Sequence, residues 1–327
     1  NVNENLAMRT LAMACLLLAW WGAATAASDV YPARPMRLIV GVPPGGTTDI
    51  VARLVAARLS DRFGRAVVVD NRSGASGILA IQLVVNSQPD GHTLLISGSS
   101  ITAIGSLYAK VPFDVAKDLV PVAFVATSAF VLVAHPSLQV TTLRDFFAYV
   151  KARPEGIHFA ASSPGTIQHL SGEMLKRMTG INLNYVPYKG TGAVMPDLLA
   201  GRVPVAFENV VTMRPHVLGG ALRGLGVTST TRSAVLPDVP TIAESGVSGF
   251  QANGRFTIFA HSRTPPQIVE RLNNEVSGFI KETEFRDRLI AQGAEPVNAK
   301  PAELKTAVAA EIAQWGKVIR EAGLRIE

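Results

Sequence analysis

Short apolar runs and longer amphipathic segments alternate along the first third of the chain. Residues 36–40, 67–69 and 93–96 are apolar runs of the kind found in buried strands. The segments between them place apolar residues three or four positions apart, as helices do. One of these predicted helices ends before Gly64 and the other runs through Val85. Strands that alternate with helices predict a parallel sheet with helices on its faces.

The same plan returns further along the chain. Residues 157–161, 183–186 and 203–207 are predicted strands. A predicted helix covers residues 167–178, and a shorter one ends near Gly201. The halves share no visible sequence identity, so the architecture repeats and the sequence does not. The fold class expected is therefore α/β, with two domains, each a mostly parallel sheet with flanking helices.

Two apolar stretches are suited to strands that cross between these domains. Residues 121–135 carry few charges and join the halves, and residues 256–260 provide a return crossing. Amphipathic patterns predict two helices near the carboxyl end, at residues 266–281 and 302–322. We therefore predict a discontinuous domain 1 and a continuous domain 2, with these bounds: 29–127 plus 257–327, and 128–256.

Residues 1–28 have the features of a signal peptide. Arg9 precedes an apolar run at residues 11–21, and Ala24-Thr25-Ala26 gives the small-x-small pattern of a cleavage site after Ala26. The run is shorter than the ~20 apolar residues of a membrane-spanning helix, although a membrane anchor is the alternative. Cys15 is the single cysteine and lies in this segment. We therefore expect an exported, soluble mature protein with neither disulfides nor cysteine-ligated metal.

The charge balance favours a small anionic partner. The chain carries a formal net charge of +6, and long-range fields of basic proteins attract anions. Nucleic acid fits less well, because the basic residues are scattered and aromatic residues make up only 6% of the chain.

Two glycine-containing loops are the strongest candidates for chemistry. Residues 43–49 follow the first strand of domain 1, and residues 162–166 follow the first strand of domain 2. Ligands of open α/β sheets lie at the carboxyl ends of strands, and N–H groups at helix starts accept carboxylate or phosphate. Helix capping without ligand contact is the alternative for either loop, and capping suits Asp49 better than contact with an anion.

Weaker candidates surround these loops. Residues 97–102, with Ser99 and Thr102, follow the third strand and could hold the far end of a ligand, or form only a polar loop. Lys189, His169 and Asn209 could also face a ligand, whereas a solvated lysine and a packing histidine are the alternatives. The sequence lacks the usual hydrolase, zinc-protease and nucleotide motifs, and its six histidines show no metal-ligand spacing. We therefore expect no enzyme activity, no cofactor and no metal.

Eight segments of the chain form one ordered pattern: residues 31–53, 69–77, 89–94, 114–121, 163–170, 186–190, 198–201 and 236–241. Together they resemble the Bug family of solute receptors, the periplasmic components of tripartite tricarboxylate transporters (TctC-like). The resemblance implies a two-domain Venus-flytrap fold of type II-like periplasmic binding proteins, with two crossing strands. It also implies ligand contacts from Gly45, Gly46, Thr47, Thr48 and Asp49, and from Ser163, Gly165, Thr166 and His169.

The function expected is capture of a small carboxylate and its delivery to a membrane transporter, by a monomer. A periplasmic sensor is the first alternative. An exported carboxylate-processing enzyme with His169 and Asp49 as an acid–base pair is the second. The chain departs from the family at Arg255, where tryptophan is common. An Arg255 side chain in the cleft would favour a second carboxylate, and one facing outward would leave ligand choice untouched.

Overall fold

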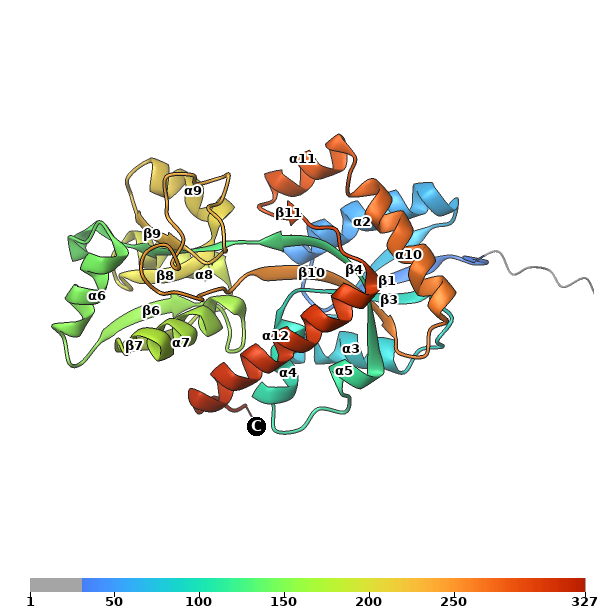
Figure 1. The fold of residues 1–327 in the computed structure, drawn as a ribbon, viewed down its shortest axis with the longest axis horizontal. Helices are drawn as coiled ribbons and strands as arrows, with labels where there is room; N and C mark the ends of the chain where they lie inside the picture. The colour runs from blue at the N-terminus through green and yellow to red at the C-terminus, as the bar shows by residue number, and fades with distance from the viewer. Residues whose placement is uncertain (1–30, 327) are drawn as a thin grey trace, which may run out of the picture. The chain divides into compact units, whose positions relative to one another are not determined.

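The computed structural model describes residues 31–326, which fold around two β-sheets. The predicted signal peptide, with Cys15 and the cleavage site after Ala26, lies outside the described residues. Both sheets belong to one compact unit that begins at Pro35. The domain bounds expected from the sequence therefore stay a prediction, whereas the two sheets are plain in Figure 1.

The first sheet has six strands in the order β11-β4-β10-β3-β1-β2. Strand β1 pairs in parallel with β2 and β3, as the alternation of strands and helices predicts. Strands β10, β4 and β11 join the sheet in antiparallel pairs. The strands are β1 Met36–Val40, β2 Val67–Asn71, β3 Thr93–Ser97, β4 Leu119–Ser128, β10 Gly254–His261 and β11 Glu295–Pro296.

The second sheet has five strands in the order β7-β6-β8-β5-β9. Strand β6 is parallel to β7 and β8, whereas β5 is antiparallel to β8 and β9. Each sheet is thus mixed: most of its strands run in one direction, as predicted, and the strand that enters from the other half, β10 or β5, runs against them. The strands are β5 Phe130–Ala134, β6 Ile157–Ala161, β7 Leu183–Pro187, β8 Val205–Asn209 and β9 Arg223–Val227.

Two segments connect the sheets, as the apolar stretches predict. The stretch at residues 121–135 divides into β4 and β5, which belong to different sheets and are separated only by Ala129. Strand β10 is the return connection and pairs with β4 from Gly254↔Ser128 to His261↔Leu119. In Figure 1 these two long strands run side by side between the sheets.

Helices cover both sheets. The sequence patterns located α2, α3, α7, α8, α10 and α12, but missed α4, α5, α6, α9 and α11. The start of α4 was interpreted as a polar loop because Ser97, Ser99 and Ser100 favour loops and caps. The helices are α2 Thr47–Phe63, α3 Ile78–Val85, α4 Ser100–Leu107, α5 Val115–Asp118, α6 Leu143–Lys151, α7 Ile167–Thr179, α8 Thr191–Leu199, α9 Val210–Leu218, α10 Pro266–Phe279, α11 Thr283–Ala291 and α12 Pro301–Glu321. No helix of residues 31–326 is long and apolar enough to cross a membrane.

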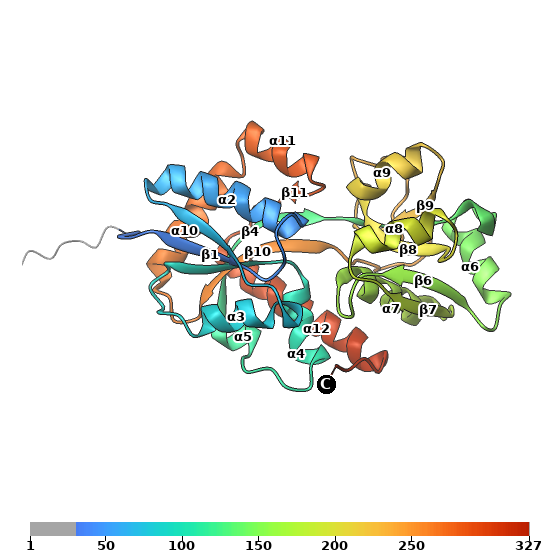
Figure 2. The ribbon, with the colours of Figure 1, turned by 180° about the vertical axis from the view of Figure 1, so that it is seen from behind.

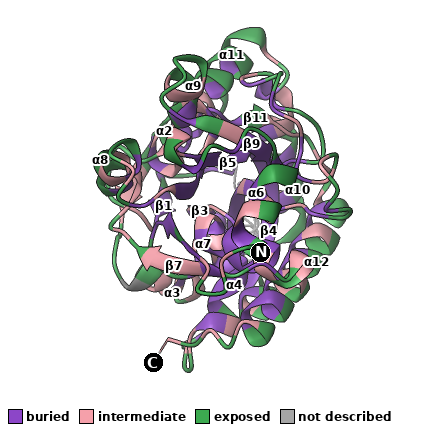
Figure 3. Ribbon diagram, turned by 90° about the vertical axis from the view of Figure 1, so that its left-hand side faces the viewer, coloured by how far each residue is buried: buried purple, intermediate pink, exposed green. Residues whose placement is uncertain are grey.

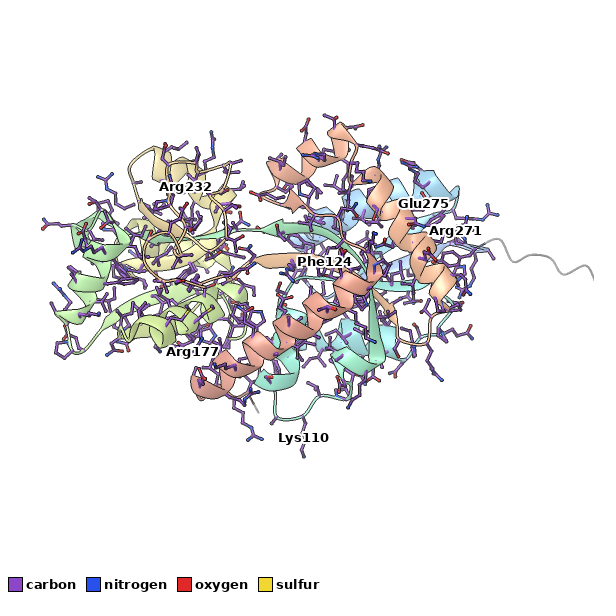
Figure 4. The ribbon with its side chains drawn as sticks, in the orientation of Figure 1. Lys110, Phe124, Arg177, Arg232, Arg271 and Glu275 are labelled. Atoms are coloured by element: carbon purple, nitrogen blue, oxygen red, sulfur yellow. The ribbon has the colours of Figure 1, made fainter. Side chains whose placement is uncertain are left out.

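Helix α12 packs against both halves of the molecule. Leu304 and Val308 lie in the core of the first sheet, whereas Trp315 lies in one core cluster with Phe159 of the second. Near the end of α12, Oε2 of Glu321 forms an ion pair with Nε of Arg177 on α7, at 3.1 Å (Figure 4). Figure 3 shows how burial concentrates on the strands and on the inner faces of such helices.

Candidate functional site

A cleft of about 390 Å³ lies where strands end and helices begin. It is bordered by the first residues of α2, α4, α7, α8 and α9, which follow β1, β3, β6, β7 and β8 in the chain. In Figure 2 the loop into α2 lies on the side of the first sheet that faces β8 and α8. The lining residues are Val42, Gly46, Thr47, Thr48, Gly98, Ser99, Ser100, Ser128, Phe130, Ser162, Thr166, Ile167, Gln168, Gly190, Thr191, Asn209, Thr212, Gly254, Arg255 and Phe256.

The starts of α2 and α7 give this cleft N–H groups that lack a helical partner. In α2 the first helical hydrogen bond runs from Ile50 N to Gly46 O at 3.0 Å, and in α7 it runs from Leu170 N to Thr166 O at 2.9 Å. The N–H groups that come before these donors have no acceptor within their helix. Together with the helix dipoles and the many hydroxyl groups of the lining, they form a surface suited to an anion.

Asp49 holds the loop that opens α2. Its Oδ2 accepts from the backbone N–H of Gly45 at 2.9 Å and from Nε of Arg53 at 3.0 Å, and its Oδ1 accepts from Asn71 at 2.9 Å. Burial opposes the negative charge, but hydrogen bonds from Arg53, Gly45 and Asn71 outweigh it and hold the pKa of Asp49 below its usual value. The carboxylate is therefore committed to its own loop and does not line the cleft.

His169 holds the loop that opens α7 in the same way. Its Nδ1 accepts from the backbone N–H of Gly165 at 3.1 Å, and its ring stacks on Tyr185 with centroids 3.9 Å apart. Burial lowers the pKa of His169 to about 4, so the ring is neutral near pH 7 and Nδ1 serves as an acceptor. The Tyr185 hydroxyl donates to the carbonyl oxygen of Ser162 in the same loop.

The twelve sites predicted from sequence fall into two sets. Those that line the cleft are Gly46, Thr47, Thr48, Ser99, Thr166 and Asn209. Those that lie outside its lining are Gly45, Asp49, Thr102, Ser163, Gly165 and His169. Apart from Thr102, the second set lies in the two loops or in the first turn of the helix that follows each loop. Thr102 is different: its hydroxyl donates to Ser99 O at 2.7 Å, and it lines a separate cavity of about 290 Å³.

Two of the lining residues, Ser99 and Asn209, use their side-chain polar atoms in hydrogen bonds within the protein. Ser99 Oγ accepts from Arg255 N at 2.9 Å and donates to Asn253 O at 3.3 Å. Asn209 caps α9 through Oδ1, which accepts from Val211 N at 2.9 Å, and its amide donates to Ser128. These contacts tie the starts of α4 and α9 to the crossing strands.

Arg255 is the one charged residue in the described lining, and its guanidinium is engaged by α12. Nη1 lies 3.9 Å from Glu311 Oε2 of α12, and the group lies 5.3 Å above the ring of Phe124. Phe124 belongs to the core packed against α12, and Figure 4 shows it beside that helix. Arg255 borders both the cleft and a second cavity of about 170 Å³ that Glu311 and Gln314 also line.

Sequence reasoning missed lining residues on the crossing strands and at α8. Ser128, Gly254 and Phe256 stand where β4 and β10 leave the first sheet. The prediction of two crossing strands already contained this signal, since such strands must border any cleft between the sheets. At the start of α8, Thr191 lines the cleft. Lys189, the residue predicted from the loop before α8, is exposed and lies outside the lining.

The described residues offer no metal site, since nowhere do three or more His, Cys, Asp or Glu side chains gather. Two mixed α/β sheets joined by two long strands, with a hydroxyl-rich cleft ringed by helix starts, define a solute-binding protein with the fold of the periplasmic binding proteins.

The chain belongs to the TctC family, the tripartite tricarboxylate transporter family receptors, whose model matches residues 51–324. It is 40% identical over 322 residues to protein BugT of Bordetella pertussis, covering 98% of this chain and 99% of that one. Among solved structures it resembles Rpa4515 of R. palustris with adipate, with a TM-score of 0.79, 38% identity and coverage of 90% and 100%. MatC of Rhodopseudomonas palustris with bound malate gives a TM-score of 0.76, 31% identity and coverage of 88% and 100%.

This family consists of binding proteins and not enzymes, so the prediction of a receptor is confirmed and the enzyme alternative is wrong. The contacts of the supposed acid–base pair agree with that result. Asp49 and His169 each bind a backbone N–H four residues earlier in the chain, and neither lines the cleft.

Proposed function

We propose that the chain is an exported periplasmic receptor that captures a small dicarboxylate in this cleft and delivers it to a tripartite transporter. The observation that carries the proposal is the convergence of five helix starts on one cleft whose charged lining residue, Arg255, pairs with Glu311 of α12. Such a surface binds anions through N–H groups and helix dipoles and does not require an arginine side chain. The relatives with adipate and malate support a ligand with two carboxylates.

The two ends of the ligand divide between the sheets in this proposal. One carboxylate binds N–H and hydroxyl groups at Thr47 and Thr48 of α2, and the other binds the backbone N–H groups of Ile167 and Gln168 at the start of α7. Gly45, Asp49, Ser163, Gly165 and His169 shape these loops from behind. Each helix start contributes up to ~2 kcal/mol when partly buried, so several together reach useful affinity.

Closure follows from the same arrangement. The lobes, taken as residues 29–127 plus 257–327 and residues 128–256, move about β4 and β10 when one ligand touches both. The family's association with a three-component transporter supports delivery to a membrane partner. The leader pattern ending at Ala26 supports export, and the monomer expected from sequence is retained in the proposal.

A thermal-shift experiment tests the binding claim. The ligand-stripped protein is heated with adipate, malate, the diamide of adipate and a neutral sugar. A ligand present at a hundred times its Kd adds about 2.7 kcal/mol to the free energy of unfolding, which raises the Tm by several degrees. We expect a shift with a dicarboxylate and none with the diamide. An equal shift with the diamide would refute the anion-receptor argument.

Transport and sensing are separated by a second measurement. If the protein supplies a transporter, deletion of the transporter's membrane components abolishes uptake of the labelled ligand and leaves binding to the receptor intact. Continued uptake in that strain, or loss of a transcriptional response without loss of uptake, would favour the sensor.

A further inference from the structure

Glu208 is a fully buried carboxyl group directly beneath the cleft. It lies on β8 between Phe207 and the cleft residue Asn209, and its side chain has no exposed surface. Its Oε2 accepts a hydrogen bond from Thr191 Oγ1 at 2.6 Å, and Thr191 lines the cleft. A single hydroxyl therefore stands between this carboxyl group and the ligand.

The surroundings disfavour a negative charge on Glu208. Among the described residues its Oε1 has no hydrogen-bond partner, and no cation pairs with the group. A charge buried without a counter-ion loses its hydration with little in return. Burial accordingly raises the pKa of Glu208 to about 7, although contacts from Thr191, the N–H of Asn209 and Gln168 oppose the rise.

The ionisable groups on neighbouring elements are occupied or face elsewhere. His169 stacks on Tyr185, Glu173 pairs with Lys176, and Asp197 pairs with Arg202 and accepts from Tyr188. The remaining ionisable groups are His158 on β6, Lys189 before α8, and Arg214 and His216 on α9. They are exposed or half-buried, and none of them shifts the pKa of Glu208.

The protonation state of Glu208 fixes the direction of the Thr191 hydroxyl. An ionised carboxylate can only accept, so the Thr191 O–H points to Glu208 and its lone pairs are left for the cleft. When Oε2 binds a proton from solvent, the new O–H donates to Thr191 Oγ1. The Thr191 O–H is then free to donate to an anion in the cleft.

We propose that Glu208 and Thr191 form a proton-controlled relay in which binding of an anion in the cleft is coupled to protonation of Glu208. Glu208 is a positioning residue that acts through Thr191. The inference rests on the proposed function, because the coupled ligand is the carboxylate of the cleft. It adds that this receptor takes up a proton with its ligand near neutral pH and releases the ligand more readily as the pH rises.

The test uses adipate as the probe, with Kd measured by calorimetry at pH 6, 7 and 8. If only the neutral form binds, Kd rises about tenfold between pH 6 and pH 8, in step with the loss of that form. Glu208→Gln keeps a donor toward Thr191, so we expect affinity close to the wild-type value at pH 6 and no rise at pH 8. Thr191→Val should weaken binding and remove the pH dependence, and Thr191→Ser should restore both.

A matched control is Glu155→Gln, which removes an exposed carboxylate from the same half of the chain and should keep the tenfold rise. Titration of adipate itself affects all variants equally. Comparison of buffers with different ionisation enthalpies should show proton uptake in the wild type and none in Glu208→Gln. Equal pH slopes in wild type and Glu208→Gln, or a wild type with no slope, would overturn the relay.

Failure of the proposed function gives a different result. In that case adipate and the other carboxylates do not bind at any pH, and the relay has no ligand to serve. Carbon-13 NMR titration of the Glu208 carboxyl in the ligand-free protein needs no ligand. We expect a midpoint near pH 7 that is absent from Glu208→Gln, and a midpoint below pH 5 would overturn the relay by itself.

Discussion

The backbone N–H of Gly165 donates a hydrogen bond of 3.1 Å to Nδ1 of His169, four residues further along the chain. Gly45 and Asp49 repeat this relationship in the other half of the molecule, with a distance of 2.9 Å. Both glycines have a positive φ, +80° and +90°, so both loops turn before their helix begins. Each loop is fixed by its own helix, which positions the N–H groups of the first helical residues for a ligand.

Replacement of His169 by Asn should change how stability depends on pH. The pKa of His169 is about 4 in the folded protein and 6.5 as a free side chain. The neutral, buried imidazole therefore contributes to the free energy of unfolding. This contribution is complete above pH 6.5 and is lost as the pH falls through 4, a loss of about 3 kcal/mol at most. Urea unfolding at pH 7 and pH 4 should show a steeper loss in the wild type than in His169→Asn.

The control for this experiment is His158→Asn, because His158 is exposed on β6. Its unfolding should follow the wild-type pH profile. An identical profile for His169→Asn would mean that the buried imidazole does not set the acid sensitivity of the fold.

Replacement of Asp49 by Ala should weaken binding of adipate by about tenfold or more, because the N–H of Gly45 loses its acceptor and the loop loosens. Asp49→Asn keeps an oxygen for that bond and should give an intermediate Kd. Asp61→Ala, which removes an exposed carboxylate from the same helix, serves as the control and should bind normally. Tighter binding by Asp49→Ala would mean that the carboxylate repels the ligand more than it orders the loop.

Gly165→Ala should destabilise the protein by about 1–3 kcal/mol. An added Cβ would lie 2.2 Å from Cδ2 of Leu107, and the φ of +80° is unfavourable for alanine. Gly105→Ala is a matched control, because this α4 position has no atom within 4 Å of the added Cβ. It should raise the free energy of unfolding by about 0.5–1 kcal/mol. Urea unfolding measures both, and equal effects would contradict the proposed clash.

Much of the fold could be predicted from sequence because its signals are local. The apolar runs at β1 and β6 and the glycines that end α2 and α7 identify their elements without tertiary information. The short helices α4 and α9 have Ser99 and Asn209 as their N-cap residues, residue types that also favour loops, so only packing decides their structure. The antiparallel entry of β5 and β10 follows from the path of the chain between the sheets, which no local pattern records.

The residues of the candidate site also differ in whether a local pattern or tertiary packing places them. Hydroxyl and glycine residues at predicted helix starts could be found, and Gly46, Thr47, Thr48 and Thr166 do line the cleft. Which side chains lie behind the lining depends on rotamers and could not be predicted. The pair of Thr191 with Glu208 shows this, because the two residues are 17 positions apart and meet only through the pairing of β8 with its neighbours.

Arg255→Met should lower stability and leave binding nearly unchanged, because the guanidinium pairs with buried Glu311 and not with the cleft. Burial raises the pKa of Glu311, and Arg255 opposes that rise. Without Arg255 the ionised form of Glu311 loses its counter-ion. We expect a loss of about 1–3 kcal/mol at pH 8. The loss should shrink as the pH falls and Glu311 becomes neutral, and Arg255→Met combined with Glu311→Gln should recover most of it.

Arg271→Met is the matched control, since Arg271 lies 5.5 Å above the ring of Phe63 and is exposed (Figure 4). Its loss should stay below about 1 kcal/mol at either pH. Calorimetry with adipate completes the test, and Kd for Arg255→Met should remain within about threefold of the wild type. A large rise in Kd with unchanged stability would instead place the guanidinium in the cleft during binding, where it would hold the second carboxylate of the ligand.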